Sequence, residues 1–213
     1  MIQYKNIYDI SVALGRESVD YPGDTPFSRK LISTTKDNGI FNLSEIVLSA
    51  HSGTHIDTPA HFISGGQTVD SYKVQDFILP AHVVSVDNRE AVEPGELENL
   101  DIEPASALLF KTDNSTSGRC KNGIFSENFV YLSPRAADLC IEKKVKLVGI
   151  DYITIEKYGD ETFPIHRKIL GNNILVLEGI NLNKVRPGNY TLICFPLKIT
   201  GSEASPVRAV LLD

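Results

Sequence analysis

Three of the five histidines of this chain lie with an aspartate in one short run, from His51 to His61. The run reads His-Ser-Gly-Thr-His-Ile-Asp-Thr-Pro-Ala-His. Neutral imidazole nitrogens and carboxylate oxygens are ligands that zinc and similar divalent metals prefer. Ligands from His51, His55 and Asp57 would make the set of three that is typical of a catalytic metal with one open coordination position. The run therefore predicts a metal site suited to catalysis.

The spacing within the run indicates which backbone carries the site. A His-x-x-x-His pair can lie on one face of a helix, but the helical zinc proteases have a glutamate directly after the first histidine. This chain has Ser52 there, Gly53 weakens a helix, and Pro59 disfavours helical geometry at the residue before it. We therefore predict a strand ending in a turn, with Gly53 allowing a tight bend, and then an extended segment. In that segment His55 and Asp57 are two residues apart and point to the same side.

Other residues of suitable type could complete this site. His61 suits proton transfer beside a metal, but it equally suits a ligand or a hydrogen-bond donor to Asp57. His166 follows a polar turn and is the better candidate for a ligand to a second metal, whereas His82 lies in a strand-like run and is predicted to make a structural hydrogen bond. Glu178 ends an apolar strand, where it either meets a buried partner or emerges into water.

Composition limits the class of protein. The chain has 213 residues, 42% of them hydrophobic, which is enough for one substantial core, and we expect one domain over residues 1–213. The formal charge is −6 without a basic cluster, which argues against binding of nucleic acid. No long apolar run or signal-peptide pattern occurs, so we expect no membrane association. The three cysteines are widely separated, a pattern typical of reduced thiols in a cytoplasmic protein.

The elements that must position the site are mostly strands. Short runs rich in valine, isoleucine and leucine predict strands over Leu43–Ser49, Ala81–Val86, Ala107–Lys111, Leu147–Ile150, Ile174–Leu177, Tyr190–Cys194 and Val207–Leu212. One helix is expected over Arg135–Lys144, with Ser133 as its N-cap and Pro134 in its first turn. Short helices are expected over Glu96–Leu100 and Ile165–Leu170, and a surface loop over Thr112–Ser126. The fold class is α/β, with more strand than helix.

The run from His51 to His61 resembles the His-x-Gly-Thr-His-x-Asp-x-Pro-x-His signature of the cyclase-like metal-dependent hydrolases, a family that includes the bacterial kynurenine formamidases (arylformamidases). Further segments resemble the same family in the same order. They are Asp9-Ile-Ser11, Tyr21-Pro-Gly-Asp-Thr-Pro-Phe27, Leu147-Val-Gly-Ile-Asp151, Glu178-Gly-Ile180 and Ser205-Pro-Val-Arg-Ala-Val210. The resemblance thus covers nearly the whole chain.

The resemblance implies a swivelling β/β/α fold, a homodimer or higher homo-oligomer, and a site for two zinc ions, with manganese as the alternative. By this resemblance His51, His55 and Asp57 bind the first metal, and Asp57, His166 and Glu178 bind the second. Asp57 would bridge the two metals, and His61 would transfer protons as the catalytic residue. The implied reaction is hydrolysis of a small-molecule amide by attack of a metal-bridged hydroxide on its carbonyl carbon, with an aryl formamide such as N-formylkynurenine as the first candidate.

Three departures from the kynurenine formamidase pattern bear on the substrate. Tyr21 stands where a tryptophan is usual, as an aromatic wall for the substrate. Thr54 stands where a smaller alanine is usual, and the glycine-bearing turn expected near Glu203 is missing. A hydrolase of cyclic amides or lactones, similar to isatin hydrolase, therefore stays an alternative that uses the same metals. A metal-dependent binding protein without turnover is the non-enzymatic alternative, against which the presence of His61 argues.

Overall fold

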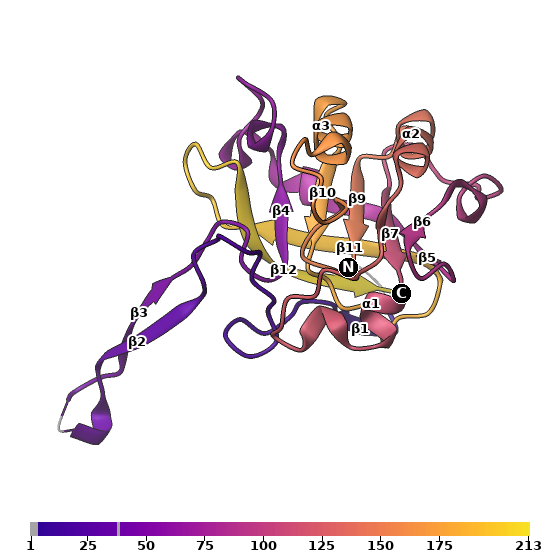
Figure 1. Cartoon of the computed structure of the whole chain (residues 1–213). Helices are drawn as coiled ribbons and strands as arrows, with labels where there is room; N and C mark the ends of the chain where they lie inside the picture. The colour runs from indigo at the N-terminus through magenta and orange to yellow at the C-terminus, as the bar shows by residue number, and fades with distance from the viewer. Residues whose placement is uncertain (1–3, 38) are drawn as a thin grey trace.

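The computed structural model of this protein describes residues 4–37 and 39–213, and strands dominate it (Figure 1). The strands are β1 Ile7–Asp9, β2 Ser28–Ser33, β3 Leu43–Val47, β4 His55–Asp57, β5 Ile78–Ser85, β6 Ala91–Val92, β7 Ala107–Lys111, β8 Tyr131–Leu132, β9 Leu147–Ile150, β10 Leu175–Glu178, β11 Gly188–Pro196 and β12 Ala204–Leu212. All seven strands predicted from the sequence are present within a few residues. The sequence patterns missed the short strands β1, β2, β6 and β8.

Seven strands close into a barrel-like ring, which confirms the expected strand-rich α/β fold. The order around the ring is β12-β11-β5-β7-β9-β10-β4, and β4 pairs again with β12 to close it. Strands β5, β7, β9 and β10 are parallel, and the remaining pairs of the ring are antiparallel. Because ring closure leaves no free edge, the very short β4 has a hydrogen-bonded neighbour on each side.

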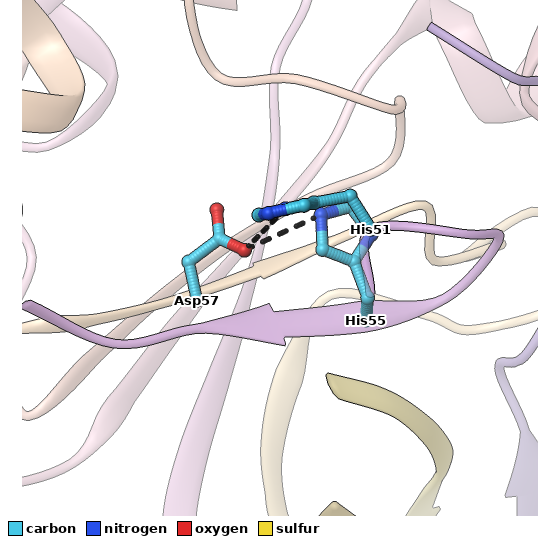
Figure 2. Close-up of side chains that lie close together, drawn as sticks. All are labelled: His51, His55 and Asp57. Carbon is cyan, nitrogen blue, oxygen red and sulfur yellow. Dashed lines mark ion pairs between the residues drawn. The ribbon is translucent and has the colours of Figure 1, made fainter. Parts of the chain in front are cut away.

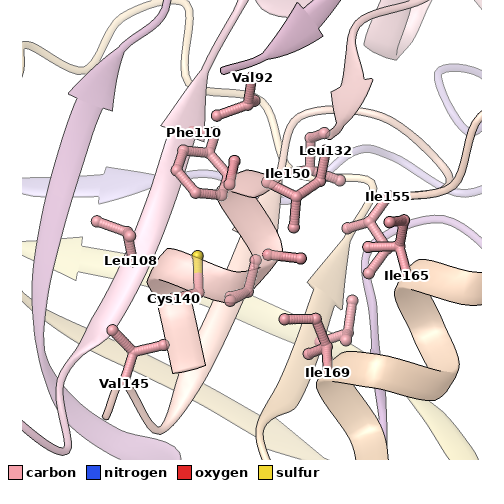
Figure 3. Packing of buried hydrophobic residues seen from close by; sticks show 14 of the residues in the cluster. Val92, Leu108, Phe110, Leu132, Cys140, Val145, Ile150, Ile155, Ile165 and Ile169 are labelled. Atoms are coloured by element: carbon pink, nitrogen blue, oxygen red, sulfur yellow. The ribbon is translucent and has the colours of Figure 1, made fainter. Parts of the chain in front are cut away.

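The core forms two layers, one inside the ring and one between the ring and the helices. Alternate residues of the strands point to opposite faces. Leu109, Leu177 and Ile56 fill the interior with apolar residues from the other ring strands. Phe110 and Ile150 point outward and pack against helices α2 and α3 (Figure 3).

Three α-helices and six short 3-10 helices complete the described structure. The α-helices are α1 Asp113–Thr116, α2 Pro134–Glu142 and α3 Pro164–Gly171, and the 3-10 helices are Thr35–Asp37, Pro59–His61, Val69–Ser71, Val74–Phe77, Pro94–Glu96 and Arg119–Lys121. The predicted N-cap of α2 is confirmed, because the Ser133 hydroxyl accepts a hydrogen bond from the amide of Ala136. The helix predicted over Glu96–Leu100 is wrong. A 3-10 turn at Pro94–Glu96 stands there instead, since Pro94 begins the turn two residues earlier.

The surface loop predicted over Thr112–Ser126 is also wrong in its first part. Residues 112, 114 and 115 are buried, and α1 begins there with the Thr112 hydroxyl as its N-cap. The reason is Asp151, a buried carboxylate at the end of β9. It accepts hydrogen bonds from the amide and hydroxyl of Thr112 at 2.8 and 2.7 Å and from the amide of Ser115 at 3.0 Å. The polar sequence predicts exposure here, whereas the buried partner that these side chains share, Asp151, is distant in sequence.

Strands β2 and β3 form a two-stranded hairpin that projects from the ring (Figure 1). Both of its faces carry exposed apolar side chains, among them Leu31, Ile32, Leu43, Ile46 and Val47. We call this hairpin the arm.

The structure also tests the predictions for His82 and the three cysteines. His82 has the structural role predicted for it, because its Nδ1 lies 2.6 Å from Oδ1 of Asn189 on the neighbouring strand. Cys120, Cys140 and Cys194 are unpaired and buried, and burial raises the pKa of each thiol to about 12. Among the described residues no helix has the length and apolar character needed to cross a membrane.

Candidate metal centre and cavity

Strand β4 places His55 and Asp57 on the outer face of the ring, beneath α3. It is held between β10 and β12, so both of its edges are hydrogen-bonded. In the register with β10, His55 lies directly opposite Glu178. Directly opposed residues of antiparallel strands have side chains on the same face. This register brings Glu178 to the histidine cluster, although it is more than a hundred residues away in sequence.

The turn that carries His51 is fixed by a close approach of two backbones. Gly53 is in the left-handed region at φ +65°, as the predicted bend requires. A Cβ atom on Gly179, the residue after Glu178, would lie 2.2 Å from the Gly53 carbonyl oxygen. The hydroxyl of Thr54 accepts a hydrogen bond from the Val12 amide at 2.9 Å and donates one to the Gly179 carbonyl at 2.6 Å. Thr54, which stands where an alanine is expected in kynurenine formamidases, therefore ties together the two segments that carry His51 and Glu178.

Helix α3 supplies His166, and a buried glutamate that sequence reasoning missed holds this helix in place. Glu156 accepts hydrogen bonds at 3.1 Å from the amides of Ile165 and His166 in the first turn of α3. Its Oε2 also lies 3.1 Å from Nδ1 of His166. This contact leaves Nε2 of His166 facing Glu178 at 3.2 Å. The only sequence signal was a carboxylate in the apolar stretch after β9.

The five predicted ligands form two groups that share Asp57. In the first group, Asp57 Oδ1 lies 2.9 Å from Nδ1 of His51 and 3.5 Å from Nε2 of His55 (Figure 2). In the second group, Asp57 Oδ2 lies 3.9 Å from Nε2 of His166. Nε2 of His55 lies 3.1 Å from Oε2 of Glu178 and so connects the groups. Each carboxylate oxygen of Asp57 thus faces a different group.

The buried atoms of this cluster fit a divalent metal. Asp57 is fully buried, yet neither of its carboxylate oxygens accepts a hydrogen bond of suitable geometry, although Oδ1 lies 2.9 Å from Nδ1 of His51. The same holds for Nε2 of His55, which lies 3.1 Å from Oε2 of Glu178. Burying such atoms without a partner costs several kcal/mol, and a carboxylate costs more than a neutral group. Converging imidazole nitrogens and carboxylate oxygens are the donor set that a divalent cation satisfies.

Electrostatics in the cluster favours charged partners for its carboxylates. Burial alone would raise the pKa of Asp57, but the charges of His51 and His55 hold it well below the ordinary value of 3.8. Burial would lower the pKa of His51, but Asp57 raises it to about 9. The pKa of His166 is raised to about 10 by Glu178 and Glu156 against the same burial effect. The cluster therefore stabilises positive charge, whether on protons or on metal ions.

His61 lies beside the cluster but belongs to neither group of ligands. It ends the 3-10 helix Pro59–His61, and its ring centroid is 4.3 Å from that of His51 and 6.0 Å from that of His166. Burial lowers its pKa below 6.5, and the charges of His51 and His166 lower it further against the attraction of Asp57. Its imidazole is therefore neutral at pH 7 and able to accept a proton.

A cavity of about 300 Å³ opens over the cluster. His51, His55, His61, His166 and Glu178 line its floor, and Tyr21, Asp24, Phe62, Ile153, Thr154 and Phe163 line its walls. Tyr21, the residue predicted to face the substrate, is half-buried and contacts Phe125 edge-on at a centroid distance of 5.6 Å. The structure thus brings every sequence-predicted site residue to one place.

Two further residues of this region were missed from the sequence. Phe163 has left-handed backbone angles of φ 48° and ψ 52°, a conformation that costs a non-glycine residue about 1–2 kcal/mol. Glu203 stands where the glycine-bearing turn was expected, and its Oε1 lies 3.4 Å from Nε2 of His51.

Comparison with known proteins agrees with this geometry. A family model described as putative cyclase matches residues 8–157. A kynurenine formamidase of Bacillus cereus is 34% identical over 203 residues, which are 95% of each chain, and one of Bacillus anthracis is 32% identical over the same share. A solved structure described as a potential metal-dependent hydrolase with cyclase activity has a TM-score of 0.83 at 28% identity and covers 98% of both chains.

Isatin hydrolase A from Ralstonia solanacearum has the same fold. Its TM-score is 0.84 at 23% identity, over 97% of this chain and 91% of that one. The family model matches residues 8–157, more than half of the chain, and the formamidases match it along nearly its full length. The chain therefore belongs to the cyclase family.

Proposed function

We propose that this protein is a metal-dependent hydrolase of amide C–N bonds whose substrates are aryl formamides, with N-formylkynurenine as the specific candidate. The observation that carries the proposal is Asp57. Its two carboxylate oxygens are buried, accept no hydrogen bond of suitable geometry and face two different groups of candidate ligands, and both groups lie at the floor of one cavity. Relatives at 34% identity along nearly the full chain are kynurenine formamidases, which supports the reaction class.

In this proposal two zinc ions are held in each chain, the first by His51, His55 and Asp57 and the second by Asp57, His166 and Glu178. Manganese is the alternative, since the same donor types accept it. When bound, such ions act as Lewis acids, which lower the pKa of water and polarise a carbonyl oxygen.

The residues of the chain then have separate tasks. The neutral imidazole of His61 accepts a proton from the water that adds to the carbonyl carbon. It then gives this proton to the nitrogen as the C–N bond breaks, because the nitrogen is a poor leaving group as an anion. Tyr21 and Phe62 exclude water on the side of the leaving group and orient it. Glu156 fixes the direction of the His166 ring through Nδ1, which leaves Nε2 available to the second metal.

The test combines metal analysis with turnover. Purified full-length protein is loaded with zinc or manganese, its metal content is measured by mass spectrometry, and hydrolysis of N-formylkynurenine, formanilide and isatin is followed by absorbance. The proposal expects about two metal ions per chain and turnover of both formamides. Preferential opening of isatin would instead favour the cyclic-amide alternative. Metal binding without any turnover would favour a binding protein.

We also propose that two copies associate through the arm. A two-stranded hairpin is marginally stable by itself in water. The exposed apolar side chains on both faces of the arm favour contact with another protein surface that buries them. A second copy offers such a surface, because apolar side chains are also exposed at the end of β11 and next to the ring, namely Phe195, Leu197 and Val74 of the 3-10 helix Val74–Phe77. Light scattering on the wild type and on an I46D variant tests this. A dimer that the substitution converts to a monomer supports the proposal, and a monomeric wild type at micromolar concentration refutes it.

A further inference from the structure

Phe163 adopts a backbone conformation that is unusual for its residue type. Its angles of φ 48° and ψ 52° lie in the left-handed region, where a bulky side chain is a rare outlier. It also precedes Pro164, and residues before proline favour extended backbone instead. Such strained residues cluster at functional sites, where the surrounding structure holds them in place.

The start of α3 gives no reason for an aromatic residue at this position. The amides of Ile165 and His166 are already bound by Glu156, and the Phe163 side chain caps no helix atom. A glycine would adopt the same angles without strain. Phenylalanine therefore differs from glycine at this position in one useful respect, which is that it places an aromatic ring there.

That ring forms part of the cavity wall next to a metal-ligand candidate. Its centroid lies 5.3 Å from that of Phe62 with an interplanar angle of 38°, and 6.4 Å from that of His166. Phe62 in turn lies 5.1 Å from His166. The two phenyl rings therefore line the same cavity as the cluster and offer apolar faces on which a planar group can stack.

We propose that Phe163 is a specificity-determining residue, and that its ring and that of Phe62 form a platform for the aryl group of an aryl amide. This proposal rests on the proposed hydrolase function and identifies the residues that select its substrate. Stacking on such a platform favours a phenyl group over an alkyl chain of similar size by about 3- to 10-fold in affinity.

The test measures binding separately from hydrolysis. Phenylurea and butylurea resist hydrolysis and share one polar group, and each is titrated into zinc-loaded full-length protein by ligand-detected nuclear magnetic resonance. Wild type is expected to bind phenylurea more tightly, and both F163A and F163G should abolish that preference. The K144G variant is the control. Lys144 is exposed, shares the left-handed conformation at φ 56°, and lies outside the cavity, so the preference should persist.

The alanine and glycine variants also test the strain. Both variants remove the ring, but only glycine removes the strain of the left-handed backbone at this position. F163G should therefore unfold at a higher temperature than F163A. A preference for phenylurea that survives in both variants, or that is absent from the wild type, overturns the proposal. If wild type hydrolyses no amide but these variants still lose the preference, the proposed function fails while the role of Phe163 stands.

Discussion

Replacing Gly179 by alanine tests whether a backbone contact sets the position of Glu178. The added Cβ atom would lie 2.2 Å from the Gly53 carbonyl oxygen and 2.8 Å from its carbon, where ordinary contact begins at 3.4 Å. Neither segment can give way easily. Gly179 donates a hydrogen bond to the Tyr152 carbonyl at 2.6 Å, and the Thr54 hydroxyl holds the Gly179 carbonyl.

The expected magnitudes follow from this geometry. Relief of the overlap needs roughly 1 Å of movement between the turn of His51 and the end of β10, and a misplacement of that size costs about 100-fold in turnover. Overpacking costs about 1–3 kcal/mol, and left-handed alanine, at the φ of +66° that Gly179 has, adds about 1–2 kcal/mol. For a chain of this length we expect the unfolding temperature to fall by about 4–20 °C.

Metal content, kcat/KM for formanilide and thermal unfolding are measured on G179A and on G118A. Gly118 is the matched control, because it has φ +79° and no atom within 4 Å of its added Cβ. G118A should lose about 1–2 kcal/mol of stability through backbone strain and keep wild-type metal content and turnover. If G179A also keeps its metal and stays within threefold of wild-type turnover, the contact does not position Glu178.

Three further predictions concern the cluster itself. The H61N variant should lose about 100- to 10,000-fold in kcat while metal content stays unchanged, and metal loss as large as that of H51A would refute a proton-transfer role. The E156A variant should bind zinc about 10- to 100-fold more weakly, measured by competition with a chromogenic chelator, because His166 Nδ1 loses its acceptor. In metal-free protein the folded pKa of His51 is about 9 and that of His166 about 10, both raised above 6.5. Their stabilisation is thus fully present below pH 6.5 and is lost progressively as pH rises from 6.5 through the folded pKa values of about 9 and 10. The unfolding temperature of chelator-treated protein should therefore fall between about pH 6.5 and 10, and a flat profile would contradict this prediction.

The sequence predicted those features that depend on local pattern. The spacing of His55 and Asp57 is a two-residue strand period, and both lie on one face of β4 as expected. Gly53 marked the bend correctly. Apolar runs located the ring strands because buried strands of a closed sheet are continuous stretches of valine, isoleucine and leucine. Strand order is absent from such patterns, since pairing depends on contacts between distant segments.

The missed residues share a physical cause. Glu156 serves the site by accepting hydrogen bonds from the first turn of α3, and a single carboxylate in a loop carries no periodic signal. Asp151 buries polar residues that looked exposed, because its donors lie nearly forty residues earlier in the chain. Phe163 resembles an ordinary aromatic residue until its backbone angles are known.

The position of β4 explains why so distant a set of residues forms one site. This strand closes the ring, so its three residues must pair with β10 on one side and β12 on the other. Pairing with β10 brings Glu178 opposite His55, and pairing with β12 brings Ala204, and with it Glu203, beside Asp57. A ligand strand of three residues could not hold this geometry at a free edge, where half of its hydrogen bonds would be lost to water. Closure of the ring and assembly of the candidate metal centre therefore depend on the same pairing of β4, and a substitution that opens this pairing should abolish metal binding even where every candidate ligand is kept.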